Sequence, residues 1–273
     1  MNTPREVVEH YNAGQEVMRL KNDFGWLERV RTEDILRRYL PASPSVVFDI
    51  GGAAGIYALP LAEQGNEVHL LDPVRLHVEQ AKRASEEQEG RGAKGIASTR
   101  VGDARQLPYA NESASAVLLL GPLYHLTEKQ DRLRALREAH RVLQKGGVVI
   151  AAAISRFASL MDGLSRGLIK DPQFHKLLEK DLKDGQHRNE SADPRYFTTA
   201  FFHRPEELKD EVAMAGFHPS ALIGVEGPVW NPLDLSYWTM PENQTKLLDL
   251  LRSIESEPSL LGASAHLVAV GRK

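Results

Sequence analysis

The fold is decided by the stretch Val46-Val47-Phe48-Asp49-Ile50-Gly51-Gly52-Ala53-Ala54-Gly55. Its first half is a short run of β-branched and aromatic residues, which is typical of a buried parallel strand. An acid and a glycine-rich bend follow, and the glycines let the backbone turn tightly and approach a bound molecule because no Cβ stands in the way. A helix is expected next, over residues 56–64. The stretch therefore predicts a strand, a ligand-binding loop and a helix.

Two classes of cofactor use such a unit, and the spacing of the glycines separates them. A dinucleotide-binding loop needs glycine at its first, third and sixth positions. Here these positions hold Gly51, Ala53 and Ile56. A nicotinamide-dependent oxidoreductase is therefore the weaker interpretation.

The composition is that of an ordinary soluble globular protein. The chain has 273 residues, with 34 Lys and Arg against 37 Asp and Glu and a formal net charge of −3. This balance does not call for a polyanionic partner, so a nucleic-acid substrate is disfavoured. The sequence contains no cysteine, which excludes disulfides, thiolate metal sites and cysteine nucleophiles. No histidine spacing indicates a metal site.

The beginning of the chain has no signal-peptide or transit-peptide pattern, and no apolar run is long enough to span a bilayer. We therefore expect a cytoplasmic protein without a membrane partner. The sequence leaves its oligomeric state open.

The order of apolar runs and helical periods predicts a parallel sheet with helices on both faces. Strands are expected at residues 46–50, 67–71, 96–101, 114–120, 148–153, 221–225 and 265–270. The predicted organisation is an N-terminal helical cap (1–44), a core (45–153), a lid or insertion (154–203), and a C-terminal part of the core (204–273) with an insertion at 226–263.

Three acids lie at or beside the ends of three successive predicted strands: Asp49, Asp72 and Asp103. In an open parallel sheet, ligands bind beyond the carboxyl ends of the strands, where the strand order reverses. A single aspartate at a strand end is commonly a cap or a turn former. Three of them in register with a glycine-rich loop favour a ligand site.

The pattern Asp49-x-Gly51-x-Ala53-x-Gly55 resembles the first motif of the class I S-adenosylmethionine-dependent methyltransferases, with alanine at the central glycine position. Residues 102–109, 120–126, 141–147 and 266–272 also look like that family. The resemblance implies an α/β, Rossmann-like fold with a seven-stranded, mostly parallel sheet and an antiparallel last strand. It also implies S-adenosyl-L-methionine as the cofactor and S-adenosyl-L-homocysteine as the product.

The resemblance further implies what the strand-end residues do. Asp72 would accept hydrogen bonds from the ribose hydroxyls, Asp103 with Ala104 would bind the adenine, and Asp49 would help to hold the ammonium of the methionine moiety. The implied cofactor-binding residues are Asp49, Gly51, Gly52, Ala53, Gly55, Asp72, Pro73, Gly102, Asp103, Ala104, Leu120 and Gly121.

Methyl transfer from a sulfonium is an in-line displacement that depends mostly on positioning, and a base is needed only if the acceptor must lose a proton. The exit of the fourth strand should lie nearest the methyl group, so His125 and Tyr124 are the candidate catalytic residues. Candidate substrate-binding residues are Tyr11 and Arg19 in the cap and Tyr196, Phe201 and His203 in the lid. Packing roles are the alternative for all of these.

The sequence thus predicts an S-adenosylmethionine-dependent methyltransferase that acts on a small-molecule acceptor. A nucleic-acid or protein methyltransferase of the same fold is the nearest alternative, although the fourth-strand exit lacks the Asn-Pro-Pro-Tyr type of motif used on flipped bases. A nicotinamide-dependent oxidoreductase and a non-catalytic cofactor-binding protein are alternatives from other classes. Neither the acceptor nor the methylated atom (oxygen, nitrogen or carbon) follows from the sequence.

Overall fold

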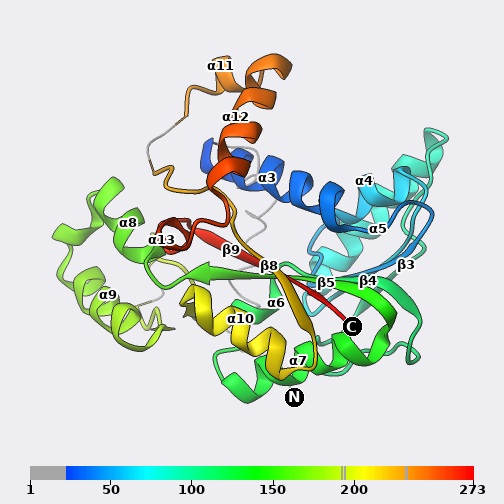
Figure 1. Ribbon diagram of the computed structural model, residues 1–273, viewed down its shortest axis with the longest axis horizontal. Coiled ribbons are helices and arrows are strands. Elements are labelled where there is room, and N and C mark those ends of the chain that lie inside the picture. The colour runs from blue at the N-terminus through cyan, green and yellow to red at the C-terminus, as the bar shows by residue number, and fades with distance from the viewer. Residues whose placement is uncertain (1–22, 192, 194, 231–232) are drawn as a thin grey trace.

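The computed structural model describes residues 23–191, 193, 195–230 and 233–273, which form a central sheet between two layers of helices (Figure 1). Seven strands build the core of the sheet. They are β1 (Val46–Ile50), β2 (Glu67–Asp72), β3 (Ser98–Val101), β4 (Ala114–Leu119), β5 (Leu143–Ser155), β8 (His218–Gly224) and β9 (His266–Arg272). The predicted α/β fold is confirmed.

The order of the strands places a ligand site beside β1. The core runs β3-β2-β1-β4-β5-β9-β8, with parallel pairing from β3 to β5 and antiparallel pairing of β9 with both β5 and β8. The chain therefore builds outward from β1 in one direction and then crosses to β4 on the other side. Such a reversal opens a crevice at the carboxyl ends of the two strands, because their connections leave toward opposite faces.

The predicted lid contributes to the sheet, which the sequence did not indicate. Two short strands, β6 (Gln186–His187) and β7 (Ala200–His203), pair with each other, and β7 also pairs in parallel with the end of β5. Phe202 lies opposite Ile154 in this register. The 13-residue length of β5 makes this pairing possible, since β5 extends beyond the end of β4.

Alternating strand side chains build two separate hydrophobic layers, as the two-residue period of a strand requires. On one face, Val47 packs in a cluster with α3 (Asp23–Tyr39), α4 (Ala58–Glu63) and α5 (Arg75–Gly90). On the other face, Phe48 packs in a cluster with α7 (Lys129–Val142) and α10 (Pro205–Met214). The core therefore lies on both sides of the sheet.

The remaining helices lie at the left-hand end of the sheet, above α3, and against the sheet itself (Figure 1). They are α6 (Pro122–His125), α8 (Ala158–Ser165), the 3₁₀ turn η1 (Leu168–Lys170), α9 (Pro172–Asp184), α11 (Leu235–Trp238), α12 (Pro241–Ile254) and α13 (Pro258–Leu261). Helix α12 packs its Leu247 and Leu251 against Leu27 and Val30 of α3. None of the helices in the described ranges combines the length and the apolar character that crossing a bilayer requires.

A buried ion-pair network fastens α3 to the C-terminal part of the chain. The guanidinium of Arg31 is fully buried and donates to the Val225 carbonyl at 2.9 Å, to Asp34 at 3.0 Å and to Glu255 at 2.5 Å. Arg38 donates to the same Glu255 carboxylate at 2.6 Å. Removing one member of such a network leaves charges buried without partners, which costs far more than losing a surface pair.

We predict that Arg31→Ala lowers the free energy of unfolding by about 3–5 kcal/mol, because Asp34 and Glu255 would lose their most buried partner. Chemical denaturation followed by circular dichroism measures this loss. The matched control is Arg29→Ala on the same helix, which breaks the half-exposed pair with Glu33. The control should change stability by less than about 1 kcal/mol. Equal effects of the two substitutions would contradict the role assigned to Arg31.

Candidate active site

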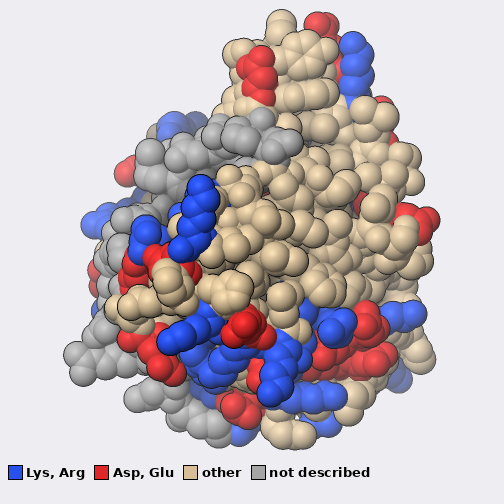
Figure 2. Space-filling view, turned by 90° about the vertical axis from the view of Figure 1, so that its left-hand side faces the viewer, with Lys and Arg blue, Asp and Glu red and all other residues tan. Residues whose placement is uncertain are grey.

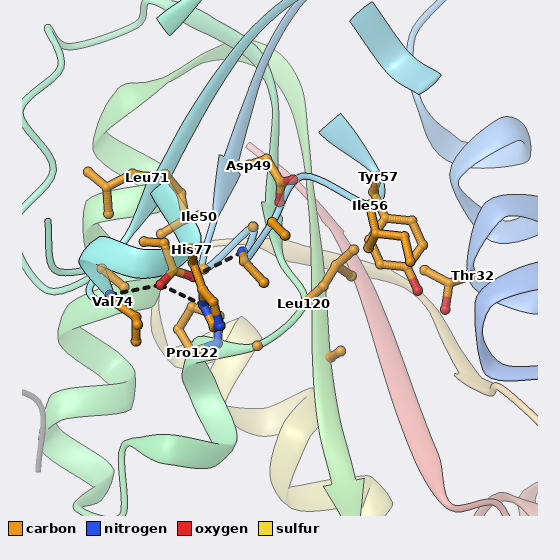
Figure 3. A pocket seen from close by; sticks show the side chains of 18 of the residues that line it. Thr32, Asp49, Ile50, Ile56, Tyr57, Leu71, Val74, His77, Leu120 and Pro122 are labelled. Carbon is orange, nitrogen blue, oxygen red and sulfur yellow. Dashed lines mark hydrogen bonds and ion pairs between the residues drawn. The ribbon is translucent and has the colours of Figure 1, made fainter. Parts of the chain in front are cut away.

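A cavity of about 680 Å³ opens at the carboxyl ends of β1, β2 and β4, at the reversal of the strand order. Of the predicted cofactor-binding and catalytic residues, all line this cavity except Gly55 and Gly102. The residues brought together are Asp49, Gly51, Gly52, Ala53, Asp72, Pro73, Asp103, Ala104, Leu120, Gly121, Tyr124 and His125. Figure 3 shows Asp49 at the tip of β1, with His77 on one side and Tyr57 and Thr32 on the other.

The loop after β1 has little space for side chains. Gly51 has φ +74°, and a Cβ there would lie 2.7 Å from the ring of Pro122. A Cβ on Gly52 would lie 2.6 Å from Oδ2 of Asp49, so the missing side chain leaves room for that carboxylate. Ala53 has φ +46°, a left-handed conformation that a non-glycine residue adopts at some cost. Alanine therefore occupies a position where glycine would adopt the same backbone conformation with less strain.

Gly55 and Gly102 instead permit close packing behind the cavity. A Cβ on Gly55 would meet Ile96 at 3.3 Å, and one on Gly102 would meet Leu71 at 2.6 Å. Both glycines therefore support the cavity wall from behind.

The carboxylate of Asp72 ties the loop to the end of β2. Its Oδ2 accepts a hydrogen bond from the Ala53 amide at 2.9 Å, and its Oδ1 accepts from the Val74 amide at 2.8 Å. His77 of α5 approaches Oδ1 with its Nδ1 at 3.2 Å (Figure 3). Asp72 is 4% exposed. Asp72 thus fixes the shape of the loop. The resemblance also implies that it binds the ribose.

Asp49 is the most unusual group in the cavity. Its side chain is buried, and among the described residues its Oδ2 has no hydrogen-bond partner. Burial, together with the nearby charge of Asp72, raises the pKa of Asp49 to about 7. A buried oxygen of this kind is costly unless a donor or a cation meets it. Asp49 is therefore suited to receive a positively charged part of a ligand.

Asp103 remains an anion, in contrast to Asp49. Burial acts to raise its pKa, but hydrogen bonds and the charge of Arg105 outweigh burial and hold the pKa below its usual range. Arg105 donates to Asp103 at 2.6 Å and to Asp131 of α7 at 2.7 Å. The Arg105 bridge orients the Asp103 carboxylate at the edge of the cavity.

The predicted catalytic residues lie on the short helix α6, directly after β4. Nδ1 of His125 lies 3.3 Å from the carbonyl oxygen of Thr199. A carbonyl only accepts, so this contact requires a proton on Nδ1 and places the ring's lone pair on Nε2 in the neutral form. The ring stacks on Phe197 and meets Tyr124 edge-on, at centroid distances of 5.8 and 4.7 Å. Tyr124 and His125 thus form one wall of the cavity.

The predicted substrate-binding residues of the lid are not brought to this cavity. Tyr196 donates its hydroxyl to Asp171 at 2.6 Å, and the ring of Phe201 lies 3.7 Å beneath the guanidinium of Arg132. His203 is fully buried and pairs with Glu211. Tyr196 packs with Phe174 and Leu178 of α9, and Phe201 and His203 lie in the added strand β7, so the aromatic run builds core instead of a binding wall. Tyr11 and Arg19 lie outside the described residues.

The far end of the cavity is built by residues that the sequence analysis did not single out. Helix α3 contributes Glu28 and Thr32, α4 begins beside Tyr57, and β9 contributes His266 and Val268. Glu28, Glu226 and His266 each have a possible ligand atom within 4.8 Å of the others, although the sequence indicated no such cluster. These residues lie as much as 238 positions apart in the sequence (28 to 266), so no local pattern could connect them.

Comparisons with known proteins agree with this geometry. Residues 48–151 match a family model described as "Methyltransferase domain". A search of the curated proteins by sequence gave no match.

Solved methyltransferase structures share the fold across most of the chain. A possible histamine N-methyltransferase from Thermotoga maritima has a TM-score of 0.58 at 22% identity, covering 96% of this chain and 95% of its own. An S-adenosylmethionine-dependent methyltransferase from Methanosarcina mazei has 0.58 at 16% identity, covering 88% and 96%. One from Mesorhizobium loti has 0.57 at 16% identity, covering 89% and 98%.

The raised pKa of Asp49 predicts how stability depends on pH. The folded protein keeps the Asp49 proton up to about pH 7, whereas the unfolded chain releases it near the ordinary value of 3.8. The folded state therefore loses stability relative to the unfolded state as the pH rises between these values. We expect Asp49→Asn to gain about 1–4 kcal/mol over the original protein between about pH 5 and pH 8.

Denaturant unfolding of both proteins across this pH range measures the difference. Asp249→Asn, which changes an exposed aspartate of α12, is the control for a loss of charge as such. A stability difference between Asp49→Asn and the original protein that stays constant with pH would show that Asp49 is ionised throughout.

Proposed function

We propose that this chain is a class I S-adenosylmethionine-dependent methyltransferase and that it transfers the methyl group of the cofactor to a small-molecule acceptor. The observation that carries the proposal is one cavity that extends from the cofactor-side acids to a far end where apolar side chains line the cavity together with Glu28, Thr32 and His266. Its volume of about 680 Å³ lies within the range of small-molecule sites. The far end is lined by Tyr57, Ala152, Val225 and Val268.

The residues of the cavity fit the proposed cofactor. The buried Oδ2 of Asp49, which has no hydrogen-bond partner among the described residues, suits the α-ammonium of the methionine moiety. Asp103 is held as an anion at the edge where an adenine amine would donate to it. When bound, S-adenosylmethionine supplies an electrophilic methyl group and a neutral thioether leaving group. The protein's own contribution is to hold and orient the reactants, which is sufficient for a large acceleration of a displacement.

The surroundings of the cavity favour a small acceptor over a polymer. Helix α3 covers the far end, and the buried Arg31 network holds this helix in place. A polymer needs an open path along the surface, whereas a cavity that a helix covers at one end accommodates a compact molecule. Among the described residues on the face it presents, Figure 2 shows acidic and basic side chains intermingled, with no basic stripe free of acidic side chains. Such a stripe is the usual electrostatic mark of nucleic-acid binding.

Cofactor binding should depend on the ionisation of Asp49. The ligand's ammonium needs the anionic carboxylate, and the free protein holds a proton there up to about pH 7. We expect the dissociation constant of S-adenosylhomocysteine to be about tenfold higher at pH 6 than at pH 8, since only a minor fraction of Asp49 is ionised at the lower pH. Isothermal titration calorimetry at the two pH values measures this ratio.

The matched variants are Asp49→Asn and Glu86→Gln, the latter on the exposed side of α5. Asp49→Asn should bind weakly at both pH values and lose the pH dependence, whereas Glu86→Gln should retain the original behaviour. Absence of any binding to the unaltered protein would refute the proposed function itself.

A further inference from the structure

A carboxylate–histidine pair lies at the far end of the cavity. His266 is the first residue of β9 and lines the cavity, and its Nδ1 lies 2.6 Å from Oε1 of Glu226. Glu226 is 2% exposed and lies behind His266, just after the end of β8. The pair therefore joins a cavity-lining imidazole to a buried acid.

The acid is held as an anion by several donors. Its Oε2 accepts hydrogen bonds from the Ser264 hydroxyl and the His266 amide, both at 2.9 Å. The Ser264 oxygen in turn accepts from the Glu226 amide at 3.0 Å. Burial opposes ionisation of Glu226, but the charge and hydrogen bonds of His266 outweigh burial and lower its pKa. An anionic Glu226 requires Nδ1 of His266 to be the donor, so in the neutral ring Nε2 is the basic nitrogen.

The register of the sheet places His266 level with the predicted site of methyl transfer, across the cavity from it. Leu119, the last residue of β4, lies level with Ala151 of β5. Ala151 pairs with Ala269 of β9, and His266 lies three residues further toward the carboxyl edge of the sheet. This is the level that β4 would reach at residue 122, where α6 begins. Two strand spacings, about 10 Å, separate β4 from β9, a gap that a small acceptor bridges.

We propose that His266, oriented by Glu226, is the general base that removes a proton from an amine acceptor. This assignment rests on the proposed function and adds to it a catalytic residue and a class of acceptor. Glu226 acts through His266 and is a positioning residue.

The step balances in protons and electrons. A protonated amine transfers one proton to Nε2 of His266, and the nitrogen lone pair becomes available. The lone pair forms the new nitrogen–carbon bond as the sulfur–carbon bond breaks, and the bonding electron pair remains on sulfur. The product is a methylated ammonium, and His266 returns its proton to solvent. Glu226 stays ionised throughout and stabilises the imidazolium.

The charges around His266 favour an acceptor that arrives as a cation. Among the described residues, the charged groups nearest this region are Glu28 and Arg31 of α3, Glu226 after β8, and Glu255 after α12. Arg31 is occupied by Asp34, Glu255 and the Val225 carbonyl, so its charge is compensated within the network. Among the described residues, Glu28 and Glu226 place two carboxylates at this end of the cavity. A carboxylate or phosphate acceptor would be repelled there, whereas an ammonium is attracted.

His125 is the competing base, and its environment differs. Its Nδ1 faces the neutral carbonyl of Thr199, whereas Nδ1 of His266 faces a carboxylate. An anionic partner stabilises the protonated ring more strongly than a carbonyl does, and it makes the ring a better proton acceptor. The geometry therefore favours His266, and separate substitutions distinguish the two.

The first experiment tests the acceptor class with defined probes. The protein saturated with S-adenosylhomocysteine is titrated with 2-phenylethylamine, 2-phenylethanol and phenylacetate by calorimetry, and transfer of a trideuterated methyl group to each probe is followed by mass spectrometry. We expect the amine to bind at least tenfold more tightly than the alcohol and to be the methylated probe. Preference for the alcohol or the acid, or no transfer to the amine, overturns the inference. The proposed function fails separately, if S-adenosylhomocysteine does not bind.

The second experiment tests the base. The pH dependence of kcat is measured with 2-phenylethylamine at saturating S-adenosylmethionine, so that the bound ligand holds Asp49 ionised. We expect kcat to fall as the pH decreases, with loss of one proton from the active form. His266→Gln should lower kcat at least 100-fold, and Glu226→Gln should shift the acidic limb to lower pH. His175→Gln, at an exposed position on α9, is the control and should leave the profile unchanged.

Two further measurements separate this role from a structural one. Thermal melting shows whether Glu226→Gln folds, and nitrogen NMR of the unaltered protein should show the His266 proton on Nδ1 at neutral pH. A proton on Nε2, or a pH limb that disappears in His125→Gln and persists in His266→Gln, overturns the assignment. Loss of activity with EDTA and recovery with Mg²⁺ also overturns it, because a cation at Glu28, Glu226 and His266 would occupy the lone pair that the base needs.

Discussion

Two aspartate side chains buried close together at the switch point of the sheet set the character of this protein. Asp72 is fixed by the Ala53 and Val74 amides, and its charge, added to burial, keeps a proton on Asp49 up to about pH 7. Such an arrangement destabilises the free protein, since an oxygen of Asp49 is buried without a described partner. A cation in the cavity removes that cost. The same electrostatic conflict thus lowers stability and provides binding energy, which is common at functional sites.

A second constraint acts on the other end of the cavity. Arg31 joins α3 to the Val225 carbonyl and to Glu255, and both partners adjoin segments that build the site. Glu28 lies one turn before Arg31 on the same helix, and Glu226 directly follows Val225. The buried ion pairs therefore set the positions of both acids near His266. The anchoring of α3 and the geometry of the far end are consequences of one network.

The sequence predicted the acids at the cofactor end of the cavity but not the residues at its far end. The cofactor end depends on local strand patterns, whereas the far end depends on contacts between residues far apart in the sequence. Asp49, Asp72 and Asp103 each follow a strand that local apolar patterning reveals, and the parallel order then brings them to one edge. The approach of His266 to Glu28 depends on the pairing of β9 with β5, which no local pattern encodes. The aromatic run that includes Phe201 is compatible with a binding wall, although such runs more often form core. Only its pairing with β5 and the contact with Arg132 resolve it as core.

The antiparallel last strand explains why the two ends of the cavity differ chemically. Parallel strands contribute their final residues to the carboxyl edge of the sheet, and here these are acids and glycines that suit a charged, close-fitting ligand. Because β9 runs the other way, it contributes its first residue, His266, to the same edge. The β8–β9 connection begins and ends at this edge, so Glu226 and Ser264, 38 positions apart in the sequence, meet beside that histidine. The antiparallel direction of β9 thus places His266, hydrogen-bonded to Glu226, at the same edge of the sheet as the acids that follow the parallel strands.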